Sequence, residues 1–162
     1  MENIEERLLQ YSEIEKFYTY FQNISLEDTS KYYSNYKFIA SNLNEISLRR
    51  AVFDFNLLIF CKFKDTEIEN FIIYELPESN GNKAYLNILA MTIYDFDFIT
   101  KSNEYMKKEL LYRGWTKIEL ILLKLQITNY IQVMLNKCMF NKEVEIKSYN
   151  DNMNTIQFSL IF

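Results

Sequence analysis

Apolar side chains alternate with a period of two over residues 51–98, and this pattern constrains the fold more than any other feature. The alternation occurs in three runs: "AVFDFNLLIFCKF" (51–63), "IENFIIYEL" (68–76) and "AYLNILAMTIYDFDF" (84–98). A period of two is typical of β-strands. "KDTE" and an Asn-Gly pair separate the runs and favour tight turns. We therefore predict a three-stranded antiparallel meander over residues 48–99.

These strands are apolar on both faces at mid-length. In the first run, Leu58 and Phe60 lie on the face opposite Ile59 and Cys61. A strand that is buried on both faces needs a cover on each side. One face should pack on helices. The second would be covered by another helical pair, by a second subunit or by a partner.

Spacings of three and four residues predict helices on either side of the meander. We expect a helical hairpin over 1–47, in which "SLED" supplies a capping box for the second helix. A helix pair is expected over 102–138. Its second member begins at "TKIE", spans 116–137 and is apolar over most of its circumference, so it should be the central buried helix. The last stretch, 142–162, reads as a β-hairpin.

The predicted order is therefore α-α-β-β-β-α-α-β-β in a single α+β domain, residues 1–162. It has an antiparallel sheet of about five strands packed with two helical hairpins. Only two glycines and one proline occur in 162 residues, which favours long elements. The start "MENIEERLLQ" has no apolar core of a signal peptide, and no long apolar segment follows. The expected location is cytoplasmic, away from membranes.

Composition excludes several chemistries. The chain contains no histidine, so His-dependent triads and zinc sites are absent. Gly81 and Gly114 are far apart, so there is no glycine-rich phosphate loop. Cys61 and Cys138 are expected to be reduced, buried thiols. The sequence therefore predicts no cofactor, no metal site and no catalytic residue.

The net charge of −4 disfavours non-specific binding to nucleic acid and favours a basic protein partner. Acidic side chains gather along the second predicted strand and its turns, and two more end the third strand beside an apolar patch. Such an acidic rim around an apolar patch is typical of a protein-binding surface. The residues assigned to this surface are Glu67, Glu69, Glu75, Glu78, Asp95, Asp97, Tyr85 and Met91.

These features predict a small acidic inhibitor that acts by occlusion and is not an enzyme. A toxin-immunity protein and a phage-encoded inhibitor of a bacterial defence system both fit this description. Asn, Ile, Lys and Tyr are abundant and have A/T-rich codons, so we infer an A/T-rich genome such as that of a low-GC bacterium or its phage.

Two alternatives remain open. The βββ-helix-ββ order is loosely similar to that of small acidic type III secretion chaperones, which implies a homodimeric binding protein. A metal-dependent phosphodiesterase or nuclease is the other, with Asp54, Asp95 and Asp97 as the carboxylate ligands of Mg²⁺ or Mn²⁺.

Overall fold

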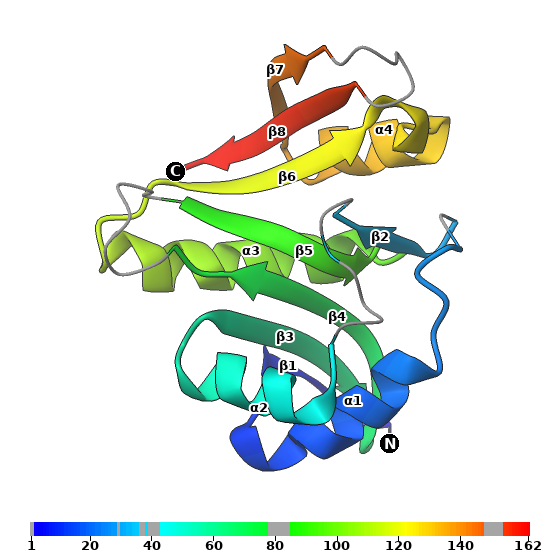
Figure 1. Ribbon diagram of the computed structural model, residues 1–162, viewed down its shortest axis with the longest axis vertical. Coiled ribbons are helices and arrows are strands. Elements are labelled where there is room, and N and C mark those ends of the chain that lie inside the picture. Colours follow the sequence, from blue (N-terminus) through cyan, green and yellow to red (C-terminus); the bar gives the residue numbers. More distant parts are fainter. Residues whose placement is uncertain (1, 29, 36–37, 39–42, 78–84, 148–153) are drawn as a thin grey trace.

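The computed structural model of the chain describes residues 2–28, 30–35, 38, 43–77, 85–147 and 154–162. Within them, eight strands form one sheet and four α-helices pack on it (Figure 1). In chain order these elements are β1 (Ile4–Leu8), α1 (Ile14–Gln22), β2 (Tyr32–Ser34), α2 (Glu45–Phe53), β3 (Leu57–Lys64), β4 (Glu67–Glu75), β5 (Tyr85–Thr92), α3 (Phe96–Leu111), β6 (Lys117–Leu123), α4 (Asn129–Lys137), β7 (Asn141–Ile146) and β8 (Thr155–Ile161).

The strand order across the sheet is β1-β3-β4-β5-β6-β8-β7, and β2 pairs with β5 beside this path. Among the described strands, β5 and β6 pair in parallel and the other pairs are antiparallel. The sheet is therefore mixed. The predicted antiparallel sheet of about five strands with two helical hairpins is wrong, because β1, β2 and β6 arise from segments that were expected to be helical.

The meander is confirmed in its central part, but its predicted ends are wrong, because residues 51–53 are the end of α2 and residues 96–98 are the start of α3. β3, β4 and β5 are consecutive antiparallel neighbours, and Leu57 pairs with Glu75, which in turn pairs with Asn87. The C-terminal hairpin is confirmed too, since β7 and β8 pair in antiparallel fashion. In both cases the period-two pattern identified the paired strands, although it did not locate the ends of β3 and β5.

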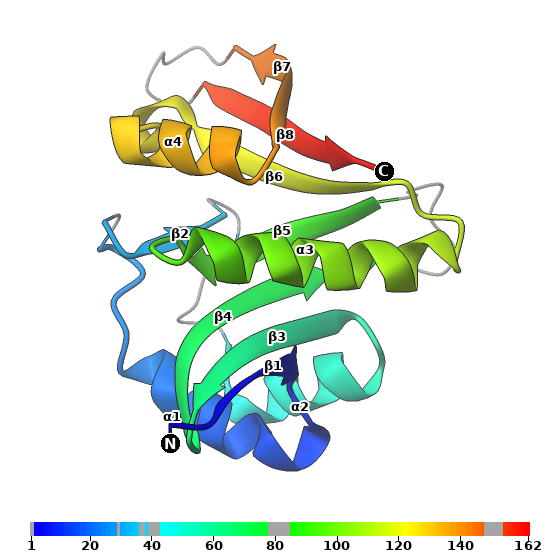
Figure 2. The ribbon, with the colours of Figure 1, turned by 180° about the vertical axis from the view of Figure 1, so that it is seen from behind.

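Both faces of the meander are covered by helices of the same chain. Ile59 and Cys61 of β3 belong to the cluster beneath α1 and α2, which includes Phe17. Phe60 belongs to a second cluster with Phe98 of α3, on the opposite face. Figure 2 shows α3 and α4 on this second face, whereas α1 and α2 cover the first in Figure 1. This arrangement accounts for strands that are apolar on both sides.

The predicted helical hairpin over 1–47 does not form, although Ile14–Gln22 of its first helix is helical as α1. Ile4–Leu8 forms an edge strand on β3, and Arg7 folds back to place its guanidinium 2.7 Å from Glu13. After α1 the chain turns, with the Asp28 amide donating to the Ser25 carbonyl oxygen and the Ser30 amide donating to Oδ1 of Asp28. Ser and Asp side chains stabilise such turns in competition with helix, which explains why "SLED" caps no helix.

The predicted central helix over 116–137 is also wrong. Its first part, "KIELILL" over 117–123, is strand β6, which lies between β5 and β8. An apolar run buried on both faces has no period that separates strand from helix. The helix begins only after Thr128, whose side chain accepts a hydrogen bond of 3.2 Å from the Ile131 amide.

Two further predictions concern the thiols and the membrane. Cys61 and Cys138 are free and buried, as predicted. In the part of the chain that the structure describes, the helices are too short or too polar to cross a lipid bilayer.

Candidate active site

The candidate site lies where the parallel strands β5 and β6 stop pairing. They are joined through α3, and they pair only between Tyr85–Asn87 and Lys117–Glu119. Toward their carboxyl ends the two strands separate (Figure 1). We call the region between Leu89–Thr92 of β5 and Leu120–Leu123 of β6 the fork. In open sheets, ligands bind outside the carboxyl ends of parallel strands, and here α3 begins directly after β5.

A short strand of the same chain lies in the fork. β2 pairs with β5 so that Tyr32, Tyr33 and Ser34 face Thr92, Met91 and Ala90. Because β4 holds the other edge of β5, β2 takes the edge that β6 occupies further back. Figure 1 shows β2 between the separating strands.

Backbone hydrogen bonds continue this pairing on either side of β2. The Asn35 amide donates to the Leu89 carbonyl oxygen over 2.7 Å, and the Ile93 amide donates to the Lys31 carbonyl oxygen over 2.9 Å. The β4–β5 register shifts between the Ile73–Ala90 and Tyr74–Ile88 pairs, which leaves Leu89 as a bulge. The Leu89 carbonyl oxygen therefore accepts its hydrogen bond from Asn35, which directly follows β2.

β2 also contacts β6. The Tyr33 hydroxyl donates a 2.7 Å hydrogen bond to the Ile121 carbonyl oxygen, and only 2% of Tyr33 is exposed. Burial raises the pKa of this phenol and outweighs the opposing effect of the bond to Ile121. Nε2 of Gln126, just beyond β6, donates to the Ser34 carbonyl oxygen over 3.3 Å. The segment thus bridges both arms of the fork.

Asp95 caps the start of α3. Its Oδ1 accepts a 3.0 Å hydrogen bond from the Phe98 amide, and its Oδ2 lies 2.7 Å from Nζ of Lys62. Nδ2 of Asn70 adds a third bond of 3.3 Å. Burial opposes ionisation, but the bonds from Lys62 and Phe98 and the Lys62 charge outweigh it and lower the pKa of Asp95. This carboxylate is therefore charged and paired at neutral pH.

Two partly exposed phenols stand near Asp95. Tyr94 donates to the Glu69 carbonyl oxygen over 2.8 Å. Tyr130, in the first turn of α4, is 40% exposed and packs on the Phe96 ring at a centroid distance of 5.4 Å. Burial and the Asp95 charge both raise the pKa of Tyr130. The Phe96–Tyr130 contact joins the starts of α3 and α4, which follow the two arms of the fork.

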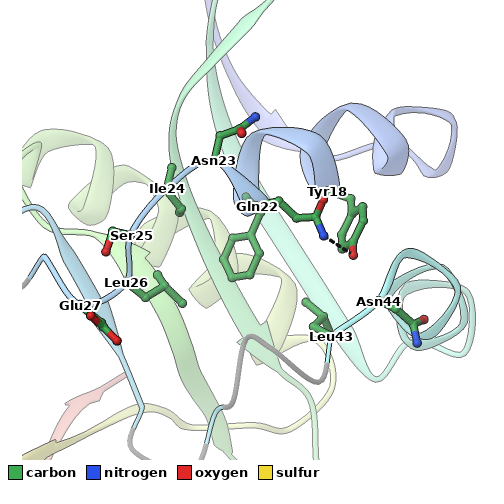
Figure 3. A pocket seen from close by; sticks show the side chains of 10 residues that line it. Tyr18, Gln22, Asn23, Ile24, Ser25, Leu26, Glu27, Leu43 and Asn44 are labelled. Atoms are coloured by element: carbon green, nitrogen blue, oxygen red, sulfur yellow. Dashed lines mark hydrogen bonds between the residues drawn. The ribbon is translucent and has the colours of Figure 1, made fainter.

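A separate open pocket of about 680 Å³ lies between the end of α1 and the start of α2. Figure 3 shows amide, hydroxyl and carboxylate groups around it, together with the apolar side chains of Ile24, Leu26 and Leu43. Nε2 of Gln22 donates to the Tyr18 hydroxyl across one wall. Asn23–Glu27 forms another wall, and β2 begins a few residues further along the chain. Its size is typical of small-ligand pockets.

The structure distributes the residues of the predicted acidic surface over several environments. Glu67 and Glu75 are exposed, Tyr85 lies beneath the Lys117 ammonium, and Glu78 lies outside the described residues. Met91 is fully buried where β5 pairs with β2. Glu69 is partly buried, Asp95 caps α3, and Asp97 is exposed in the first turn of that helix. Their role in partner binding stays a prediction.

The predicted metal cluster does not form. Asp54 ends α2 before the first residue of β3 and pairs with Arg50, whereas Asp95 contacts Lys62 near the other end of β3. Within the described ranges, no group of three potential ligands is close enough to hold a metal ion. The sequence placed three carboxylates on neighbouring strands, but the register separates them along the strand axis.

Sequence reasoning missed Tyr33, Lys62 and Tyr130. Lys62 alternates correctly on its strand, but its partner comes from a turn 33 residues later. Tyr33 and Tyr130 were interpreted as parts of apolar helical stripes. Among the site residues, only Asp95 has a local sequence signal for its role, because an aspartate directly before a helical segment is a typical N-cap.

Comparisons with known proteins place the fold. No family model matches the sequence, and no curated protein resembles it closely enough in sequence to match. Solved structures do match. A GNAT-family acetyltransferase from Streptococcus pneumoniae superposes with a TM-score of 0.72 at 9% identity, covering 99% of this chain and 100% of the other.

Two ribosomal-protein acetyltransferases are similar as well. The ribosomal-protein-S5-alanine acetyltransferase of Vibrio fischeri matches with a TM-score of 0.66 at 13% identity, over 99% of this chain and 94% of its own. A ribosomal L7/L12 α-N-protein acetyltransferase in complex with coenzyme A gives 0.66 at 9% identity, over 98% and 93%.

These matches overturn the predicted function. Structures that cover nearly the whole chain are acetyltransferases, so the predictions of an occluding inhibitor, an immunity or anti-defence protein, a secretion-chaperone-like binding protein and a nuclease are wrong. The prediction that the chain is not an enzyme is contradicted by the same finding. The eight-stranded mixed sheet with its four helices is the fold of the GNAT acetyltransferases.

Proposed function

We propose that this chain is an enzyme that transfers an acetyl group from a coenzyme A thioester to an amine. The observation that carries the proposal is the match to GNAT acetyltransferase structures over both full lengths, with a TM-score of 0.72. The parallel β5–α3–β6 unit, which separates into a fork, supplies a place for a ligand at the carboxyl ends of its strands.

Coenzyme A does not fit the fork as it stands. β2 already takes the free edge of β5, and Tyr33 closes the distance to β6. Phosphate groups bind well at a helix start with free amides and a positive field. Here Asp95 occupies the Phe98 amide, and Asp97 adds a second carboxylate in the same turn. We therefore assign no step of the reaction through the cofactor.

Among the groups beside the fork, Tyr130 is the one we assign to proton transfer. It is partly exposed, and its raised pKa keeps its hydroxyl protonated at neutral pH, as a proton donor requires. Asp95 is unsuited to act as a base because its lowered pKa and its bond to Lys62 make its carboxylate a weak proton acceptor. Its role here is to cap α3 and to fix the start of that helix.

The acceptor we propose is an amine on a basic peptide or protein. An amine is cationic at neutral pH, and a chain with a net charge of −4 attracts cations. The pocket between α1 and α2 has Glu27 on its wall, together with amide and hydroxyl groups suited to hold an ammonium ion (Figure 3).

The test is a transfer assay with the purified full chain. Acetyl-CoA is offered with N-terminal ribosomal-protein peptides, lysine-containing peptides and a polyamine, and both free coenzyme A and the mass of each acceptor are followed. One acceptor should gain an acetyl group, and the gain should depend on native protein. If no amine is acetylated and acetyl-CoA does not bind in calorimetry, the proposal is wrong.

A further inference from the structure

We propose that residues 31–35 form an internal strap that closes the fork and must leave it before a ligand enters. The inference rests on the proposed function only in naming that ligand as a coenzyme A thioester. The opening of the strap is a property of the chain itself and is testable without any ligand.

The strap forms the hydrogen bonds of the β5 edge that β6 leaves unpaired, and this edge would otherwise be open to a ligand. β4 saturates one edge of β5, and β6 leaves the other edge after Asn87. An unpaired strand edge is a template for an extended ligand or peptide, which adds to the sheet by main-chain hydrogen bonds. The strap makes those bonds with the bulged Leu89 carbonyl and the Ile93 amide. Any extended ligand at this edge must therefore displace it.

The attachment of the strap is small. Its strand has three residues, whereas the neighbouring β4 has nine. The Tyr33 hydroxyl and Gln126 tie it to the β6 side. β4 is paired along both edges, so its hydrogen bonds break only when the sheet unfolds. A three-residue strand at an edge can detach by local unfolding, which costs less free energy.

The segment that leads into the strap also forms a wall of the α1–α2 pocket. Asn23–Glu27 lines that pocket, and the turn around Asp28 separates it from β2 by a few residues. Movement of the strap would therefore move the wall that we assign to the acceptor amine. The fork and the pocket are coupled by one continuous stretch of chain.

A reversible lock provides the experiment. Ser34 and Ala90 are Cα partners across the β2–β5 pair. Such partners lie about 4.5–5.5 Å apart, a separation that a disulfide spans. Ser34→Cys with Ala90→Cys should hold the strap closed when oxidised and free it when reduced. The native Cys61 and Cys138 are buried, and Ser34→Cys alone serves as the matched control.

Amide hydrogen exchange measures how often the strap opens when no ligand is present. In the reduced double variant, the Asn35 and Ile93 amides should exchange at least about tenfold faster than the slowest β4 amides. Oxidation should slow both to the β4 rate, and Ser34→Cys alone should show no such change. If Asn35 and Ile93 are as slow as β4 before oxidation, the strap does not open and the inference is overturned.

A second variant loosens the strap. Tyr33→Phe removes the bond to Ile121, and the loss of one hydrogen bond should speed exchange at Asn35 up to about tenfold. Tyr112→Phe is its control, since Tyr112 is 96% exposed beyond the end of α3 and does not contact the strap's partners β5 and β6 through any bond described. Equal exchange rates in Tyr33→Phe and Tyr112→Phe would contradict the role of Tyr33 as the anchor.

Calorimetry with acetyl-CoA then tests what the strap excludes. The reduced double variant should bind, the oxidised form should not, and reduction should restore binding. Tyr33→Phe should bind up to about tenfold more tightly than the unmodified chain, because its open state is more populated. Equal affinity of the locked and unlocked forms would overturn the inference. If no form binds acetyl-CoA, the proposed function fails, and the exchange rates still decide whether the strap opens.

Discussion

Nζ of Lys62 on β3 lies 2.7 Å from Oδ2 of Asp95 at the start of α3, so a strand lysine balances the charge of the helix cap. The pair reaches across β4, where Asn70 donates a further bond to the same oxygen. Side chains of Lys62 and Asp95 are only 18% and 21% exposed. The start of α3 is thus held by charge within the chain, at a place where a phosphate would otherwise be attractive.

Replacement of Asp95 should destabilise the fold in two steps. Asp95→Asn keeps a side-chain oxygen for the Phe98 amide but removes the charge opposite Lys62, so we expect a loss of about 1 kcal/mol in the free energy of unfolding. Asp95→Ala also removes the cap and should cost about 2 kcal/mol. Urea denaturation followed by circular dichroism measures both.

The matched control is Asp97→Ala. Asp97 lies in the same first turn of α3 but is exposed, so its removal should change stability little. A loss at Asp97 as large as that at Asp95 would mean that helix-dipole electrostatics dominates over the specific contacts of Asp95.

The Asp95 contribution should vanish in acid. Its pKa is lowered in the folded state, so the unfolded chain takes up a proton first as the pH falls. The stabilisation is therefore complete above about pH 5 and is lost as the pH drops through about 4 toward the folded-state value. The difference in unfolding free energy between the unmodified chain and Asp95→Asn should shrink over that range.

This difference isolates one residue. Glu13 also has a lowered pKa, because Arg7 bonds to its carboxylate, but Glu13 is present in both proteins and its effect cancels. A difference that stays constant from pH 7 to about pH 3 would show that Asp95 acts only as a neutral cap.

Glu119 should matter more than its acidic neighbours. It is 4% exposed on β6, lies 2.7 Å from the Lys117 ammonium, and accepts a hydrogen bond of 2.6 Å from Gln157. Glu119→Ala removes the acceptor of the Gln157 bond and one of the two carboxylates beside Lys117, which keeps Glu143 at 3.1 Å, so the free energy of unfolding should fall by about 1–2 kcal/mol. Thermal and urea unfolding measure the loss. Glu104→Ala, at an exposed position of α3, is the control and should unfold like the unmodified chain.

The fold was predictable where one pattern had one interpretation. The runs in β3 and β4 have polar residues at alternate positions near their ends, and their central parts formed strands as expected, with Ile59 and Phe60 on opposite faces. The run in β6 is apolar on both sides, so its sequence does not distinguish a buried strand from a buried helix. Because this segment was interpreted as a helix, the predicted sheet was wholly antiparallel and the parallel β5–α3–β6 unit was not predicted.

The candidate site was less predictable than the fold. The Tyr33–Ile121 bond joins residues 88 positions apart and depends on a strand of three residues, for which no local pattern exists. Asp95 was selected correctly as a distinctive residue but assigned to a strand end, because an aspartate after an alternating run fits both a strand end and a helix cap. The absence of histidine and of a glycine-rich loop argued against an enzyme, yet neither is required by an acid–base role for a tyrosine.

Tyr130 provides the most direct test of the proposed chemistry. Tyr130→Phe keeps the ring that packs on Phe96 and removes only the hydroxyl, so it should unfold like the unmodified chain. If this hydroxyl transfers the proton, kcat for acetyl transfer should fall about 100-fold with little change in KM for the acceptor. The matched control is Tyr112→Phe, because Tyr112 is 96% exposed beyond the end of α3. The raised pKa of Tyr130 also predicts that activity persists to alkaline pH, since the phenol stays protonated there. An unchanged kcat in Tyr130→Phe, measured beside an active Tyr112→Phe control, would remove Tyr130 from the mechanism.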